Sequence, residues 1–64
     1  MQILAALRDG PATAEALARR IYRIPPAMIP AATRNVLAHL IALSELGAVS
    51  TPGPIGSDSV FAAH

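Results

Sequence analysis

Few side chains in this sequence could carry out acid–base or metal chemistry, and they are scattered along the chain. The 64 residues include no cysteine, four acids that stand singly, and two histidines, His39 and His64, that lie far apart. A protein metal site needs three or four converging ligands. The sequence therefore predicts no metal site and no cofactor in this chain.

The serine hydroxyl groups likewise provide no basis for nucleophilic catalysis. A serine nucleophile depends on a neighbouring general base. No base is apparent in the sequence for any of the four candidates, which are Ser44, Ser50, Ser57 and Ser59. The last two lie in a segment rich in glycine and proline, where serine is an ordinary turn residue. We therefore predict no catalytic residue, and a chain that is not itself an enzyme.

Arginines are the next candidates, because their guanidinium groups bind phosphate and can read guanine. The net charge of +1 creates no large field. For Arg20 and Arg23 we favour a solvated helix edge over phosphate contact. The residues that could make weak, sequence-tolerant RNA contacts are Arg19, Arg20, Arg23 and Arg34, and those that could read DNA bases are Arg34, Asn35 and Thr33.

Specific DNA binding has little support in the rest of the pattern. The helix that would read bases presents a thin set of groups opposite its predicted buried side, namely Arg34, Ala38, Ile41 and Glu45. The segment "TPGPIGSDSV" has no lysine or arginine and contains Asp58, which would face phosphate unfavourably. We expect any nucleic-acid contact to be auxiliary.

The composition points to a protein partner. Apolar residues make up 53% of the chain and charged residues 14%. So small a domain must then expose more apolar surface than solubility favours, unless something covers it. The lack of cysteine fits a reducing compartment, and we expect a cytoplasmic location. No segment approaches the roughly 18 apolar residues of a membrane span, and "MQILAALRDG" lacks the basic start of a secretory signal.

Apolar spacing and capping residues predict two helices in the first third of the chain. Ile3, Leu4 and Leu7 predict about two turns that stop at residues 10–11, so short that we expect a truncated helix. The second helix is expected to begin after Thr13 as its cap and to end at Tyr22 or Arg23. It has a Glu15–Arg19 pair and a buried stripe of Ala14, Leu17, Ala18 and Ile21.

The connection "RIPPAMIP" is unusually apolar for a turn between two helices. Pro25 and Pro26 predict an extended run, and Pro30 suits the first turn of a new helix. We expect the apolar side chains of the connection to fold over the core and close one edge of it; these are Ile24, Met28 and Ile29.

The strongest helical pattern spans residues 31–46. Its buried face is predicted to hold Ala32, Val36, Leu40 and Leu43, with Gly47 as the left-handed stop. After it, "AVST" and "SVFAA" read as two short strands around the turn-forming "PGPIGSD". The predicted fold class is mainly α with a small β-hairpin: a winged helix-turn-helix of three helices and a wing, as one domain over residues 1–64.

Several of these segments also resemble a known family. "GPATAEAL", Tyr22 at the end of the second helix, "PPAMIPAA", "VLAHL", Leu43 and "GAV" follow, in order and approximate spacing, the winged-helix domain located C-terminal to the catalytic domain in many metallo-β-lactamase-fold hydrolases. The residues that match its motif are Tyr22, Pro26, His39 and Gly47. The match implies a winged-helix fold and no catalytic role for those residues.

The resemblance further implies an accessory domain, a C-terminal fragment of a larger hydrolase. Zinc would belong to the catalytic domain, because His39 and His64 cannot make its H-x-H-x-D-H signature. The implied partners are that catalytic domain or a second protomer, with RNA as a weak substrate contact. The alternative is a free-standing winged-helix DNA-binding transcription regulator.

Three positions near the end of the third helix, and His39 before them, depart from an ordinary solvated face. Ile41, Ala42 and Leu46 lie where the resemblance implies charged residues. Our candidate protein interface consists of Leu37, Ile41 and Leu46. His39 lies about 60° from the centre of the predicted buried stripe. We expect it to be half-buried and hydrogen-bonded to a carbonyl, with contact to a partner domain or nucleic acid as the alternative.

Overall fold

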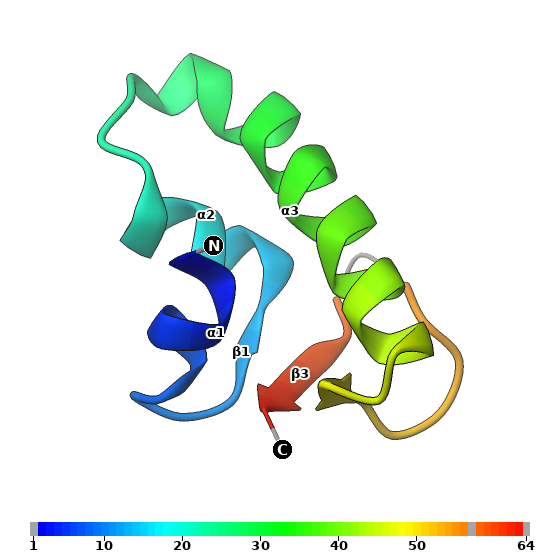
Figure 1. Cartoon of the computed structure of the whole chain (residues 1–64). Coiled ribbons are helices and arrows are strands. Elements are labelled where there is room, and N and C mark those ends of the chain that lie inside the picture. The colour runs from blue at the N-terminus through cyan, green and yellow to red at the C-terminus, as the bar shows by residue number, and fades with distance from the viewer. Residues whose placement is uncertain (1, 57, 64) are drawn as a thin grey trace.

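The computed structural model describes residues 2–56 and 58–63, and in that part the chain forms three α-helices, a 3-10 helix and three short strands (Figure 1). The elements follow the order α1 (Gln2–Leu7), β1 (Ala12–Thr13), α2 (Ala14–Ile21), η1 (Pro26–Met28), α3 (Ile29–Glu45), β2 (Val49–Ser50) and β3 (Val60–Ala63). The predicted order of three helices and a hairpin is confirmed. The bounds of α2 and α3 lie within two residues of those expected.

The start of α2 follows the predicted capping chemistry. The backbone N–H of Ala16 donates to Thr13 Oγ1 at 3.1 Å, which satisfies one of the free donors at the helix start. Arg19 and Glu15 form the expected pair, with Nε and Oε2 3.7 Å apart. Both side chains are mostly exposed, so this pair contributes no more than about 0.5 kcal/mol.

The connection between α2 and α3 differs from the prediction. Pro25 is extended, but Pro26 begins the turn η1, whose Met28 N–H donates to the Pro25 carbonyl at 2.9 Å. Ile24 is half-buried and Ile29 is buried, whereas Met28 is 54% exposed. Met28, in the 3-10 turn, stays more than half exposed, so the expectation that all three apolar residues cover the core is wrong for Met28.

Helix α3 ends as its glycine predicts. Gly47 has φ +79°, the N–H of Ala48 donates to the Leu43 carbonyl at 2.9 Å, and that of Gly47 donates to the Ser44 carbonyl at 3.0 Å. This pair of bonds is a Schellman cap, which satisfies carbonyls that the last turn leaves free. The chain therefore turns sharply from α3 into β2.

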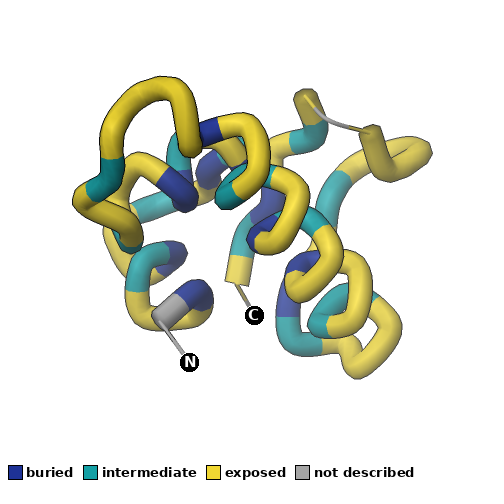
Figure 2. The backbone as a smooth tube through the Cα atoms, turned by 90° about the horizontal axis from the view of Figure 1, so that it is seen from above, coloured by how far each residue is buried: buried dark blue, intermediate teal, exposed yellow. Residues whose placement is uncertain are grey.

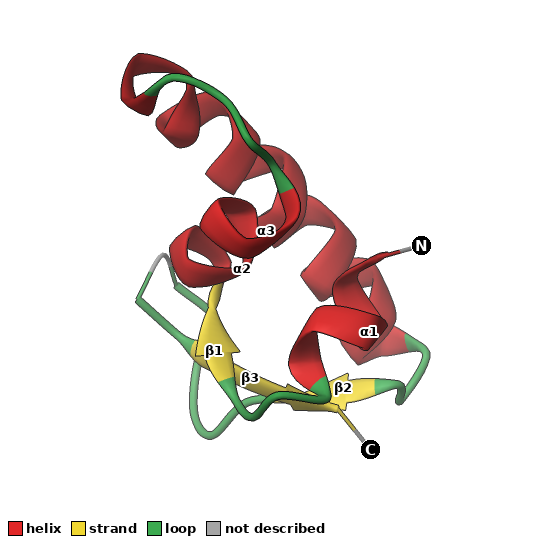
Figure 3. Ribbon diagram, turned by 90° about the vertical axis from the view of Figure 1, so that its left-hand side faces the viewer, coloured by secondary structure: helices red, strands yellow, loops and turns green. Residues whose placement is uncertain are grey.

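The hairpin contains a pairing that the sequence did not predict. Strands β2 and β3 pair antiparallel, with Val49 opposite Ala63. The two-residue strand β1 also pairs with β3 and places Ala12 opposite Phe61, so the order across the sheet is β1-β3-β2. Figure 3 shows the three strands along one side of the helices. The last strand thus ties the start of α2 to the end of α3.

The core lies between the helices and this sheet (Figure 2). Its largest fully buried side chains are Phe61, Leu17, Leu40, Val36 and Val49. Ala32 and Leu43 pack against this cluster as partly buried members, as the helical pattern predicted. In α1, Ile3 and Leu7 are buried and Leu4 is exposed, because a helix this short packs one narrow side.

In the described part of the chain, no helix combines the length and the apolar character needed to cross a membrane.

Candidate functional site

One side of α3 is not covered by the rest of the domain. Arg34, Ala38, Ile41 and Glu45, which we call the outer stripe, are all exposed, as the helical pattern predicted. They follow one another at spacings of four, three and four residues, so they lie along one line of the helix. Figure 1 shows α3 along the side of the molecule away from α1 and β1. Among the described residues, neither Arg34 nor Glu45 forms an ion pair.

The structure separates the three residues of the predicted protein interface. Leu46, just past the end of α3, is 80% exposed, and Ile41 is 37% exposed. Leu37 is instead half-buried and packs against the core, so it is wrong to count it among the exposed apolar groups. It follows the fully buried Val36 directly and lies one turn before Leu40, which draws it to the edge of the core. Ile41 and Leu46 remain as the exposed apolar pair.

His39 is exposed, contrary to the expectation of a half-buried histidine. Its side chain makes no hydrogen bond within residues 2–56 and 58–63. Since α3 is packed on one side only, a residue at the edge of the buried stripe can turn to solvent. His39 is therefore free to meet a partner, and its contact role stays a prediction.

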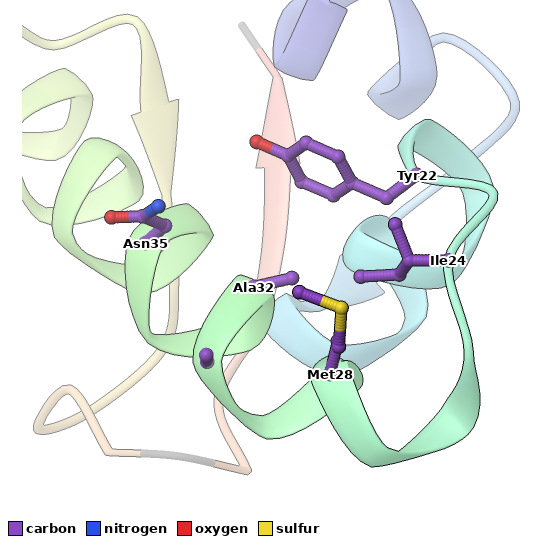
Figure 4. Close-up of a pocket in the computed structure, with 6 residues that line it drawn as sticks. Tyr22, Ile24, Met28, Ala32 and Asn35 are labelled. Atoms are coloured by element: carbon purple, nitrogen blue, oxygen red, sulfur yellow. The ribbon is translucent and has the colours of Figure 1, made fainter.

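Beside the N-terminal half of α3 there is a hollow with a volume of about 260 Å³. Its lining comes from the end of α2, the connection and α3, and consists of Tyr22, Ile24, Met28, Ala31, Ala32 and Asn35. Figure 4 shows Ile24, Met28 and Ala32 pointing toward one another and the Tyr22 ring above them. This hollow was not predicted from the sequence, because its lining comes from three separate segments of the chain.

The five predicted nucleic-acid residues lie in different parts of this region. Arg19 and Arg20 are in the last turn of α2, Arg23 is in the connection, and Arg34 and Asn35 are in α3; all are exposed. Arg19 is paired with Glu15, and Arg20 Nη1 donates to the Ala6 carbonyl of α1 at 3.4 Å. Between Glu15 and Glu45 these four arginines are the only charged residues. The segment from residue 16 to residue 44 therefore carries a net positive charge.

The two other residues of the DNA interpretation, Thr33 and Asp58, do not favour contact with nucleic acid. Thr33 Oγ1 is buried and has no hydrogen-bond partner among the described residues, so this hydroxyl does not face an incoming base. Asp58 in the wing is exposed. Ser59 in the wing accepts a hydrogen bond from the Gly56 N–H at 2.8 Å and donates to the Pro54 carbonyl at 3.3 Å, which is a turn role. Ser57 and His64 lie outside the described residues.

Within the same described part, no three histidine, cysteine, aspartate or glutamate side chains come together as a metal site.

Taken together, a helix, a short strand, two more helices and a hairpin that pairs back with the first strand define a winged-helix domain. The family model of the beta-lactamase associated winged helix domain matches residues 13–54, more than half of the chain. The chain belongs to this family, which confirms the resemblance, and the motif residues Tyr22, Pro26, His39 and Gly47 all lie in the matched range. Comparisons with curated proteins and with solved structures give no match.

Proposed function

We propose that this chain is a non-catalytic accessory domain of a metallo-β-lactamase-fold, metal-dependent hydrolase, and that it docks through the outer side of α3. The family name associates the domain with beta-lactamase proteins, and winged-helix accessory domains are typically non-catalytic. The observation that carries the docking proposal is the exposure of Ile41 and Leu46 beside so few charges. The surface it meets belongs to the catalytic domain or to another protomer.

The exposed pair, Ile41 and Leu46, suits a contact between two domains of one polypeptide better than a contact between separate molecules. Fully burying one such side chain is worth about 1.5–3 kcal/mol, and both are already part-covered. A contact of this size gives only weak association between separate molecules. On one polypeptide the effective concentration reaches roughly the millimolar range, at which such a contact is populated. This supports a domain that is part of a larger hydrolase.

In this proposal the reaction and the zinc ion belong to the catalytic domain. The exposed arginines, above all Arg23 and Arg34, offer an auxiliary contact to an anionic substrate such as RNA. No hydrolysis is expected from the 64-residue chain alone. An assay with added zinc on this chain should give the buffer rate.

The test compares two isoleucines with similar exposure. Ile41 on α3 is 37% exposed, and Ile55 in the wing is 41% exposed. We expect Ile41→Glu to weaken binding to the metallo-β-lactamase-fold catalytic domain of the same gene at least tenfold in titration calorimetry, with Ile55→Glu unchanged. Equal affinities for wild type and both variants would overturn the docking proposal. Circular dichroism checks that both variants keep the fold.

A further inference from the structure

The outer stripe has a pattern that reads the same way from both ends. Its spacings of four, three and four residues are symmetric about a point between residues 39 and 40. If a second copy of α3 lies antiparallel against the first, Arg34 of each copy faces Glu45 of the other. At the centre, Ala38 of each copy faces Ile41 of the other. Every position of the stripe then meets a complementary one.

The central layers fit by size. Spacings of four and three are those of the apolar seam in a coiled coil, where two helices pack side chain into gap. Ala38 leaves room for the helices to approach, and Ile41 of the other copy fills that room. Both residues are exposed in the single chain. The second copy would therefore remove from water one of the apolar side chains that the fold leaves exposed.

The charged residues at the two ends of the outer stripe favour an antiparallel arrangement of the two helices. Glu45 lies eleven positions after Arg34, or about 16 Å along the helix, so the two ion pairs form at opposite ends of the contact. In a parallel arrangement arginine would face arginine and glutamate would face glutamate, which is repulsive. Antiparallel helix dipoles also attract. Since both charges lack an ion pair among the described residues, they are available for this role.

We propose that a second copy of this chain covers the outer stripe in an antiparallel, two-fold arrangement of α3 against α3. This inference deepens the proposed function and rests on it for the premise that this side of α3 is an interface. It names the second protomer as the occupant. A two-fold contact uses the same patch on both copies, so it closes at two and does not grow into filaments.

The contact is weak in the isolated chain. One helix face lies at the low end of specific interface sizes, so the 64-residue chain exists as a monomer–dimer equilibrium that shifts with concentration. The net charge of +1 opposes association very little. Salt weakens the contact, because the two end pairs are exposed to solvent.

The test uses charge reversal in trans, with sedimentation equilibrium at low salt over a range of protein concentrations. Arg34→Glu places two glutamates opposite each other at both ends, and Glu45→Arg places two arginines there. Each variant alone should associate at least tenfold more weakly than wild type. An equimolar mixture of the two should dimerise again, because each end then pairs glutamate with arginine. The double variant should dimerise like wild type.

Matched controls change the same charge elsewhere. Arg23→Glu in the connection and Asp58→Arg in the wing are exposed positions off the outer stripe, and both should leave the equilibrium unchanged. A mixture that stays monomeric would overturn the proposal, as would a wild-type chain that is monomeric at millimolar concentration. Neither result touches the catalytic-domain test with Ile41→Glu, so failure of this inference and failure of the proposed function can be told apart.

Discussion

The inner and outer sides of α3 differ in how far their side chains are buried, although one helix carries both. The inner side places Val36 and Leu40 in the core, whereas all four residues of the outer stripe are exposed. Leu40 is 0% exposed and its neighbour Ile41 is 37% exposed. One side of the helix therefore specifies the fold, and the other is available to specify a partner.

The largest effect is expected when two neighbouring residues on opposite sides of α3, Leu40 and Ile41, are each replaced by alanine. Leu40→Ala should lower the free energy of unfolding by about 2–5 kcal/mol, because it leaves a cavity in the core. Ile41→Ala should change it by less than about 0.5 kcal/mol. Urea unfolding followed by circular dichroism measures both. Comparable losses for the two variants would mean that the outer side of α3 also belongs to the core.

The second largest effect is expected at Gly47, in the turn that ends α3. Gly47→Ala should cost about 1–2 kcal/mol, because its φ of +79° is unfavourable for a residue with a Cβ, although the space around it is open. Gly56→Ala is the matched control, since Gly56 also has open space but no positive φ. Thermal unfolding should separate the two. A Gly47 variant as stable as the Gly56 variant would contradict the role of the Schellman cap.

The third effect is expected at the N-terminal cap of α2, the helix that packs against the inner side of α3. Thr13→Ala removes the acceptor for the Ala16 N–H and should cost about 1 kcal/mol. Thr13→Ser keeps a hydroxyl in the same place and should recover most of that loss. Chemical denaturation of the three chains gives the comparison. If serine fails to recover stability, the β1 pairing of Thr13, not its cap, is what the threonine supports.

The parts of the fold that were predicted rest on local signals. Thr13, Gly47 and the apolar repeat of α3 each act within a few residues of their own position, so the sequence shows them directly. The two residues of β1 carry no alternating pattern, because they become a strand only when Phe61 lies opposite Ala12. The turn η1 and the exposure of Met28 likewise depend on how the connection meets α3.

The candidate site divides in the same way. The outer stripe was predictable, since it is the geometric opposite of a strong buried stripe. Leu37 and His39 were not, because both lie at the edge of that stripe, where neighbouring elements decide between burial and exposure. The hollow at Tyr22 forms only where the end of α2, the connection and α3 come together, so no single segment of the sequence predicts it.

The smallest effect is expected for the nucleic-acid alternative. Arg34→Ala should change the affinity for duplex DNA by less than about twofold, because the described wing has no cation to join it and Asp58 faces outward. Fluorescence anisotropy at two salt concentrations measures this. Affinity that depends on DNA sequence, falls steeply with salt and drops with this substitution would support a DNA-binding regulator instead.

We expect this domain to meet its partner through the outer side of α3. The most direct measurement is a set of amide chemical-shift maps by NMR, recorded as the chain is concentrated and as the catalytic domain is added. We expect the shift changes to concentrate on Arg34, Ala38, Ile41, Glu45 and Leu46, with the wing and the hollow at Tyr22 little affected. Changes centred on the wing or the hollow, with α3 unmoved, would contradict this expectation.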